Sequence, residues 1–224
     1  MERVVLIVNA NHDTPTMYLA AWAKSLLKKL NPADLVRYIE IEGDSVTRAN
    51  LESAITAENP TLVLFHCHGT AESVLGFEFN ILVSINDNAG ILAGRDVHAL
   101  SCQAGKLLGP QVVGVGAKSF IGYKEDFEFW HLNKQSDEER VLDPYAFPTL
   151  MPAFKAVEAL LLGKSAKEAF DLSQRAFADS MLSLITSTNS NLNTMVAAST
   201  LQNKRHQVLL GDNMPIQLTM RPSS

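Results

Sequence analysis

Short apolar runs alternate along the chain with longer segments in which apolar residues recur at helical spacing. The runs predict strands at residues 4–10, 35–41, 61–67, 97–100, 119–123 and 208–210. The longer segments predict helices at residues 16–30, 45–58, 149–162, 165–186 and 191–202, with a short helix opening at 105–108. Strands that alternate with helices are typical of βα units around a mostly parallel sheet, so the pattern predicts an α/β fold.

Two stretches depart from this alternation. Residues 74–87 alternate between apolar residues and polar or small ones, and a turn cluster, Asn-Asp-Asn-Ala-Gly, occupies 86–90. We therefore expect a small antiparallel excursion there. Residues 133–140 are rich in charged and amide side chains and predict an exposed loop. The apolar runs at 4–10 and 61–67, in contrast, predict strands buried on both faces.

Composition narrows the class of protein. The chain has 224 residues, of which 46% are hydrophobic and 19% charged, and its formal net charge of -5 argues against a protein that tracks nucleic-acid phosphates. No apolar stretch approaches the ~20 residues of a membrane span, so we expect no membrane association. The N-terminus lacks the basic start of a signal peptide, and two cysteines are too few for a disulfide framework, which together predict a cytoplasmic protein with reduced thiols.

The most informative segment is the apolar run that ends in Cys67-His68-Gly69. In an open α/β sheet the carboxyl ends of the strands form the ligand crevice, so His68 is expected where such folds carry out chemistry. Gly69 allows the backbone to approach a ligand closely. Cys67 points to the opposite face of its strand, because strand side chains alternate, and is expected to pack beneath a helix.

A second strand ends in the same way. Cys102 follows the run at 97–100, and Gly105 lies just beyond it. A thiol and an imidazole at the ends of neighbouring strands make a nucleophile and acid/base pair for acyl transfer. The thiolate of Cys102 would attack a carbonyl and the His68 imidazolium would protonate the departing amine. The backbone N–H groups of Gly69 and Cys102 would then hold the oxyanion.

These two blocks resemble those of the caspase-like (clan CD) cysteine peptidases. Two further segments resemble the gingipain and CHAT-domain branches of that superfamily: Val-Gly-Ala-Lys-Ser-Phe-Ile-Gly at 115–122 and Val-Leu-Leu-Gly-Asp at 208–212. The four motifs occur in the family's order and span about residues 4–218. The resemblance implies a single domain over 1–224, a caspase-like three-layer αβα sandwich, and peptide-bond hydrolysis by His68 and Cys102 without a cofactor or metal. It also implies a peptide or protein substrate and allows for a regulatory or targeting protein partner.

Substrate specificity is expected to come from loops beside the dyad. His12 and Asp13 follow the first strand, and Glu125, Asp126 and Glu128 follow the fifth. Asp13 and Asp126 are the candidates for lining a substrate pocket. Carboxylates there would favour a basic P1 residue through charge-assisted hydrogen bonds to arginine or lysine.

Two other functions stay open on the sequence alone. The chain can be a catalytically silent member of the fold that serves as a binding or regulatory module. Alternatively, His66 and His68, with Cys102 or His98 nearby, can form a zinc site and make the protein a metal-dependent hydrolase. Zinc sites need three firm ligands, and His66 lies one step deeper in the sheet than His68, so hydrogen bonding to a neighbour is the favoured role of His66. Orienting His68 is an additional role that stays open for it.

Overall fold

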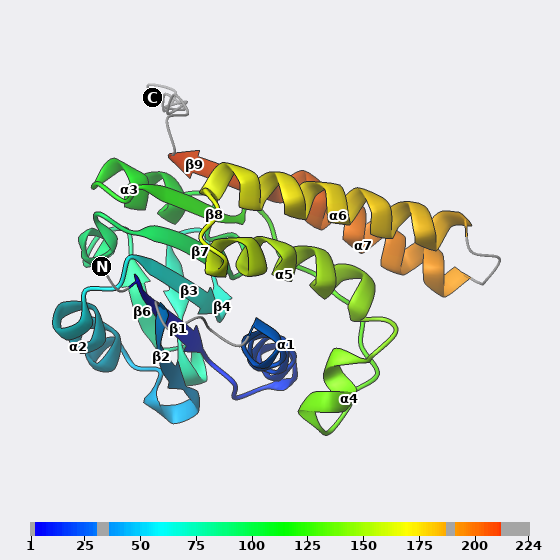
Figure 1. The fold of residues 1–224 in the computed structure, drawn as a ribbon, viewed down its shortest axis with the longest axis horizontal. Helices are drawn as coiled ribbons and strands as arrows, with labels where there is room; N and C mark the ends of the chain where they lie inside the picture. The colour runs from blue at the N-terminus through cyan, green and yellow to red at the C-terminus, as the bar shows by residue number, and fades with distance from the viewer. Residues whose placement is uncertain (1–2, 31–35, 187–190, 212–224) are drawn as a thin grey trace, which may run out of the picture.

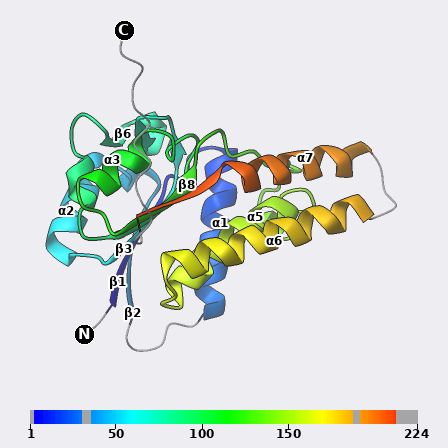
Figure 2. The same cartoon turned by 90° about the horizontal axis from the view of Figure 1, so that it is seen from above.

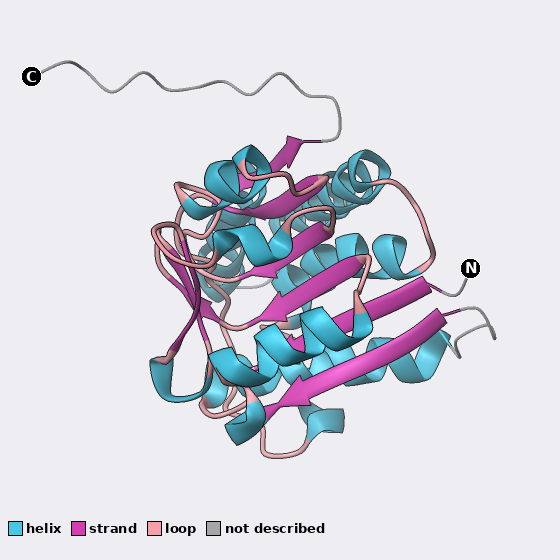
Figure 3. Ribbon diagram, turned by 90° about the vertical axis from the view of Figure 1, so that its left-hand side faces the viewer, coloured by secondary structure: helices cyan, strands magenta, loops and turns pink. Residues whose placement is uncertain are grey.

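The computed structural model describes residues 3–30, 36–186 and 191–211 and contains a central sheet of six strands in the order β2-β1-β3-β7-β8-β9 (Figures 1 and 3). The first five strands in this order pair in parallel, and β9 runs antiparallel to β8. The bounds of these strands are β1 Arg3–Asn9, β2 Val36–Glu42, β3 Leu62–His66, β7 Asp96–Leu100, β8 Ser119–Tyr123 and β9 Gln207–Gly211.

Helices cover both faces of the sheet. One face packs against α1, α5 and α6, with α7 lying against α5 and α6, and the other face packs against α2 and α3 (Figure 2). The described helices are α1 Thr14–Leu30, α2 Arg48–Glu58, α3 Leu108–Gly114, α4 Asp137–Val141, α5 Phe147–Leu161, α6 Ala166–Thr186 and α7 Asn191–His206. This arrangement is the predicted three-layer αβα sandwich with a mostly parallel sheet.

Side-chain alternation assigns each strand residue to one of two cores. Along β3, Leu62 and Leu64 join the core beneath α1, α5 and α6, whereas Val63 and Phe65 join the core beneath α2 and α3. Every residue of β3 is buried, and so is all of β1 after Arg3. The prediction that these two strands are buried on both faces is confirmed.

A small antiparallel sheet begins immediately beyond β3. It consists of β4 His68–Gly69, β5 Ser73–Leu75 and β6 Ile81–Ser84, in the order β4-β5-β6. Its buried apolar side chains, Val74, Leu82 and Val83, extend the core beneath α2 and α3. The excursion predicted from the alternation at 74–87 is therefore present, and His68 belongs to its first strand.

Several predicted boundaries differ from the structure. The helix predicted at 105–108 begins only at Leu108, because the N–H of Gly105 instead bonds to the carbonyl of Tyr123. The helix predicted from residue 45 begins at Arg48, where the side chain of Thr47 caps it, and α7 runs four residues beyond the predicted end at 202. Residue 35 of the second predicted strand and Asp212 of the last motif lie outside the described residues.

The segment 133–140 is not simply a loop. Ser136 and Glu139 form a capping box that starts α4, with the Ser136 side chain accepting from the backbone N–H of Glu139 and the Glu139 carboxylate accepting from that of Ser136. The Ser-x-x-Glu pattern at 136–139 is a sequence signal for this helix start. The polar composition of the segment nevertheless favoured a loop.

Within the described part of the chain, none of the helices combines the length and apolar character that crossing a membrane requires.

Two histidines are buried in the core and make its stability depend on pH. Burial lowers the pKa of His66 to about 3, with a smaller contribution from nearby His98, and lowers the pKa of His98 to about 4. Both imidazoles are therefore neutral in the folded protein over the range in which an exposed histidine, with a pKa of 6.5, becomes protonated. Below that pH the unfolded chain binds more protons than the folded one.

We therefore expect the free energy of unfolding to fall as the pH drops from 6.5 toward these lowered values, by up to ~1.4 kcal/mol per pH unit for each histidine. Urea unfolding of the wild type and of His98→Leu between about pH 7.5 and pH 5 measures this slope. The variant should show a shallower dependence because one titrating group is gone. An identical slope in the two proteins would contradict the assignment.

Candidate functional site

The site lies at the carboxyl edge of the main sheet, where β3 and β7 end side by side. The two strands pair in parallel, with His66 opposite Leu100, so the chain leaves both at the same edge. His68 lies two residues beyond the end of β3, and Cys102 two residues beyond the end of β7. The sequence predicted that these two segments lie close together at neighbouring strand ends, and the structure places them so.

Gly69 brings the two segments into direct backbone contact. A Cβ at this position would lie 2.6 Å from the carbonyl oxygen of Cys102 and 2.9 Å from the Cβ of Ser101. Real Cβ atoms do not approach other atoms so closely, so only glycine fits here without a shift. Position 69 thus requires glycine because the chain packs tightly against Ser101 and Cys102 there.

The imidazole of His68 is held by a carboxylate from a different strand end. Its Nε2 lies 2.7 Å from Oδ2 of Asp13, which follows β1. Because an ionised carboxylate only accepts hydrogen bonds, Nε2 must carry a hydrogen. In the neutral imidazole the lone pair is therefore on Nδ1, which forms no hydrogen bond with any described residue.

Asp13 also starts helix α1. Its Oδ1 accepts from the backbone N–H of Thr16 at 3.1 Å and from the Thr16 hydroxyl at 2.6 Å, which is the bonding of a helix N-cap. Desolvation raises the pKa of Asp13, but the hydrogen bonds from Thr16 and His68 outweigh it and leave that pKa below the ordinary value. The carboxylate is therefore ionised at neutral pH.

Both oxygens of Asp13 are thus engaged within this chain. The role of Asp13 in lining a substrate pocket, which the sequence suggested, stays a prediction.

A cluster of aromatic rings surrounds the histidine pair. The rings of His12 and His68 lie 5.7 Å apart between centroids, and Phe77 and Phe79 contact His12 edge to face at 5.4 and 5.3 Å. Phe79 also lies 4.9 Å from His68, yet it is 56% exposed. Glu78 and Phe79 both have left-handed backbones, with φ of 49° and 64°, which is uncommon for residues other than glycine.

The thiol of Cys102 is partly buried and faces an acidic segment. Burial raises its pKa, a backbone hydrogen bond with Phe127 lowers it, and the carboxylates of Asp126 and Glu128 raise it further. The pKa ends above the ordinary value, so the resting side chain is a neutral thiol. Among the described residues, no hydrogen bond joins this thiol to His68.

Asp126 lies beside the loop after β7, where the sequence suggested a substrate pocket. Its Oδ1 accepts from Nε2 of Gln103 at 2.9 Å, and its side chain is exposed. The neighbouring Glu125 pairs with Lys106 at 3.2 Å and accepts, through its carbonyl, from the N–H of Gln103. These contacts anchor the segment after β8 to the loop after β7, and the pocket role of Asp126 stays a prediction.

The zinc site that the sequence left open is not assembled as envisaged. His66 is fully buried, stacks on Phe154 at 5.1 Å and bonds through Nδ1 to Asn9 at 2.7 Å. His98 is also fully buried, so neither imidazole joins His68 in a ligand group. The suggestion that His66 orients His68 is wrong, because Asp13 makes that contact.

Cys67 is where the alternation of strand side chains predicts it. It is buried in the core beneath α2 and α3, and its thiol donates to the carbonyl of Val8 at 3.5 Å. Burial raises its pKa to about 12, so it is an inert core thiol.

One group of side chains in the described residues is spaced to hold a metal ion. One ligand atom each from His12, Asp13 and His68 lie within 4.8 Å of one another. The cluster shares two residues with the candidate acid/base machinery.

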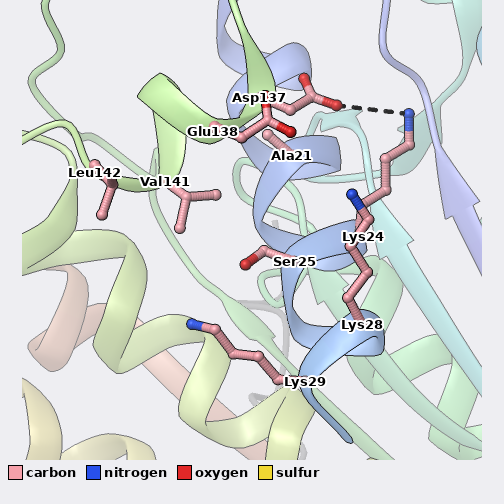
Figure 4. Close-up of a pocket in the computed structure, with 9 residues that line it drawn as sticks. All are labelled: Ala21, Lys24, Ser25, Lys28, Lys29, Asp137, Glu138, Val141 and Leu142. Atoms are coloured by element: carbon pink, nitrogen blue, oxygen red, sulfur yellow. Dashed lines mark ion pairs between the residues drawn. The ribbon is translucent and has the colours of Figure 1, made fainter. Parts of the chain in front are cut away.

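A pocket of about 280 Å³ lies elsewhere, between α1 and α4, and Figure 4 shows the residues that line it. Lys24, Lys28 and Lys29 of α1 line it from one side, and Lys24 reaches Asp137 of α4 at 3.9 Å. None of the predicted site residues lines this pocket.

Two features of the site had no clear sequence signal. The aromatic cluster depends on the turn at Phe77–Phe79, whose two left-handed residues, Glu78 and Phe79, are not glycines. The bond between Asp13 and His68 joins the loop after β1 to the strand β4, and the apolar pattern does not specify how these two segments lie. The Asp-Thr-Pro sequence at 13–15 is a signal for a helix start, and Asp13 is the cap of α1.

In comparisons with known proteins, no protein-family model matches this chain and no curated protein matches it. Its function is therefore inferred from the geometry of the site.

The contact at Gly69 yields a stability prediction. Gly69→Ala should destabilise the protein by ~1–3 kcal/mol, because the added methyl group must push apart the backbones at residues 69 and 102. Gly90→Ala is the matched control, since a Cβ there meets nothing within 4 Å. Urea unfolding measures both, and equal stabilities would show that the two backbones are not in tight contact.

Proposed function

We propose that this chain is a cysteine peptidase of the caspase-like type, with Cys102 as nucleophile and His68 as general acid and base. The observation that carries the proposal is the meeting of these two segments at adjacent parallel strand ends, with the Gly69 backbone packed against Cys102. The bond between His68 and Asp13 adds to it, because it leaves Nδ1 as the nitrogen that can take a proton.

The acylation step uses these groups in order. Nδ1 of His68 accepts the proton of the Cys102 thiol as the sulfur forms a bond to the substrate carbonyl carbon. The C–N bond then breaks, and the imidazolium returns the proton to the leaving amine. Water, deprotonated by the same imidazole, hydrolyses the thioester and releases the acid and the free thiol. Because the resting thiol is neutral, this proton transfer is part of the attack.

The main-chain N–H of Cys102 is the proposed oxyanion donor. It donates to no backbone carbonyl among the residues that the structure describes. A backbone N–H next to the nucleophile that has no carbonyl partner is the kind of donor that stabilises a tetrahedral intermediate. The N–H of Gly69 is the second proposed donor.

The acidic segment after β8 supports a preference for basic P1 side chains. Asp126 and Glu128 act electrostatically on the Cys102 thiol, so they lie near the bond to be cleaved. A lysine or arginine at P1 would offset the effect of these carboxylates on the thiol and would itself gain a charge-assisted bond.

Peptidyl acyloxymethyl ketones with Arg, Lys, Asp, Asn or Leu at P1 test the proposal. We expect the Arg and Lys probes to label the wild type, Cys102→Ala to abolish labelling, and His68→Ala to slow it by ~10²–10⁴-fold. Cys67→Ala is the matched control, since it removes the chain's other thiol from a buried position, and it should label normally.

A different pattern of alkylation would contradict the proposal. If iodoacetamide alkylates Cys102 in the folded protein but no peptidyl ketone does, the peptidase assignment is wrong.

Asp13 is proposed as the positioning residue for His68, and Asp13→Asn isolates that role. Asparagine is as good a helix N-cap as aspartate, so α1 should keep its start. The substitution removes the negative charge that fixes the Nε2–H tautomer, and we expect labelling by the preferred ketone to slow by ~10-fold or more. The thermal unfolding midpoint of the variant is measured in parallel. A variant that labels at the wild-type rate would refute the positioning role.

A non-catalytic binding or regulatory module is the second candidate. The observation that favours it is the raised pKa of Cys102, caused by burial and then by acidic neighbours, which is unusual for a reactive thiol. In that case the carboxyl edge of the sheet would bind a partner peptide without cleaving it. Binding of an unmodified basic peptide to Cys102→Ala, with no ketone labelling of the wild type, would favour this function.

A further inference from the structure

An unpaired imidazole lies beside the proposed catalytic histidine. Both ring nitrogens of His12 are buried and have no hydrogen-bond partner. A buried polar atom without a partner costs ~1–3 kcal/mol, so native proteins rarely leave one unexplained. The surrounding rings of Phe77 and Phe79 offer no acceptor, and they leave His68 and Asp13 as the polar groups nearby.

We propose that His12, Asp13 and His68 form a binding site for Zn²⁺ that regulates the peptidase. Their ligand atoms lie within 4.8 Å of one another and comprise two imidazole nitrogens and one carboxylate oxygen. This donor set suits zinc, which in many sites takes three protein ligands and a water molecule. The chain's other histidines described in the structure do not join this group.

The contact distances indicate how the ion would fit. Zinc bonds of ~2.0–2.1 Å at tetrahedral angles hold neighbouring ligand atoms ~3.3 Å apart. Nε2 of His68 and Oδ2 of Asp13 are 2.7 Å apart, so the ion would replace the hydrogen between them and widen the contact by ~0.6 Å. One nitrogen of His12 would complete the set and gain the partner that it otherwise lacks.

The surroundings already support such a ligand set. The second carboxylate oxygen of Asp13 accepts two hydrogen bonds from Thr16, which fixes the direction of the first. The backbone N–H of His12 also donates to the Thr16 hydroxyl, at 3.1 Å. Outer hydrogen bonds of this kind orient metal ligands.

Metal binding would switch off the chemistry of His68. A neutral imidazole that binds a metal through Nε2 carries its only hydrogen on Nδ1. Nδ1 then has no lone pair with which to accept the proton of Cys102. This inhibition rests on the proposed function, whereas the binding of zinc does not.

Isothermal titration of metal-free protein with ZnCl₂ tests the site. We expect one ion per chain in the wild type and in Cys102→Ala, and an affinity at least ~10-fold weaker in His12→Phe, which keeps the aromatic packing but removes both nitrogens. His12→Ala serves as a second variant, with circular dichroism to verify folding. His206→Ala, which removes a histidine of α7 outside the group, is the matched control.

The possible failures are distinguishable. Absence of zinc binding, or binding that His12→Phe leaves unchanged, overturns the site whatever the peptidase result. For regulation, ketone labelling of each protein is compared with and without zinc: the ion should slow the wild type at least ~10-fold and His12→Phe much less. If zinc binds through His12 but does not slow ketone labelling of a protein that the ketones do label, only the regulatory role is wrong.

Discussion

The backbones at Gly69 and Cys102 lie closer together than a methyl group would allow, and the geometry of the candidate site depends on that contact. Parallel pairing of β3 and β7 brings the two segments to one edge, and the missing side chain lets them touch. The loop after β7 and the strand β4 therefore form one unit. A shift in either strand end would move both candidate groups relative to a bound substrate.

The sequence predicted the parts of this arrangement that follow from strand period and strand order. Apolar runs that end in His68-Gly69 and in Cys102 suffice to put both residues at one edge of a parallel sheet, and alternation correctly buries Cys67. The partner of His68 could not be predicted, because the loop after β1 brings Asp13 close only when α1 packs against the sheet. The short helix α4 was not predicted, although the sequence contains its capping residues, because the high content of charged side chains favoured an exposed loop.

The electrostatics of the site depend entirely on tertiary structure. The two candidate groups have opposite surroundings: His68 faces one ionised carboxylate at bonding distance, whereas Cys102 is desolvated and faces two carboxylates that disfavour its thiolate. Composition gives no hint of this contrast, because all these acidic residues belong to ordinary polar loops. The same sheet buries two neutral histidines in its core, so the chemical properties of an imidazole in this fold depend on how deeply it is buried.

Asp13 performs two tasks with its two oxygens, one as the cap of α1 and one as the partner of His68. Each task tolerates a different replacement. Asparagine or serine would serve the helix but not the histidine, and glutamate would keep the charge but lose the short reach that capping needs. Aspartate alone meets both demands. A substitution at position 13 that spares one of these contacts therefore still disturbs the other, so the start of the helix and the orientation of the histidine cannot be varied independently through this residue.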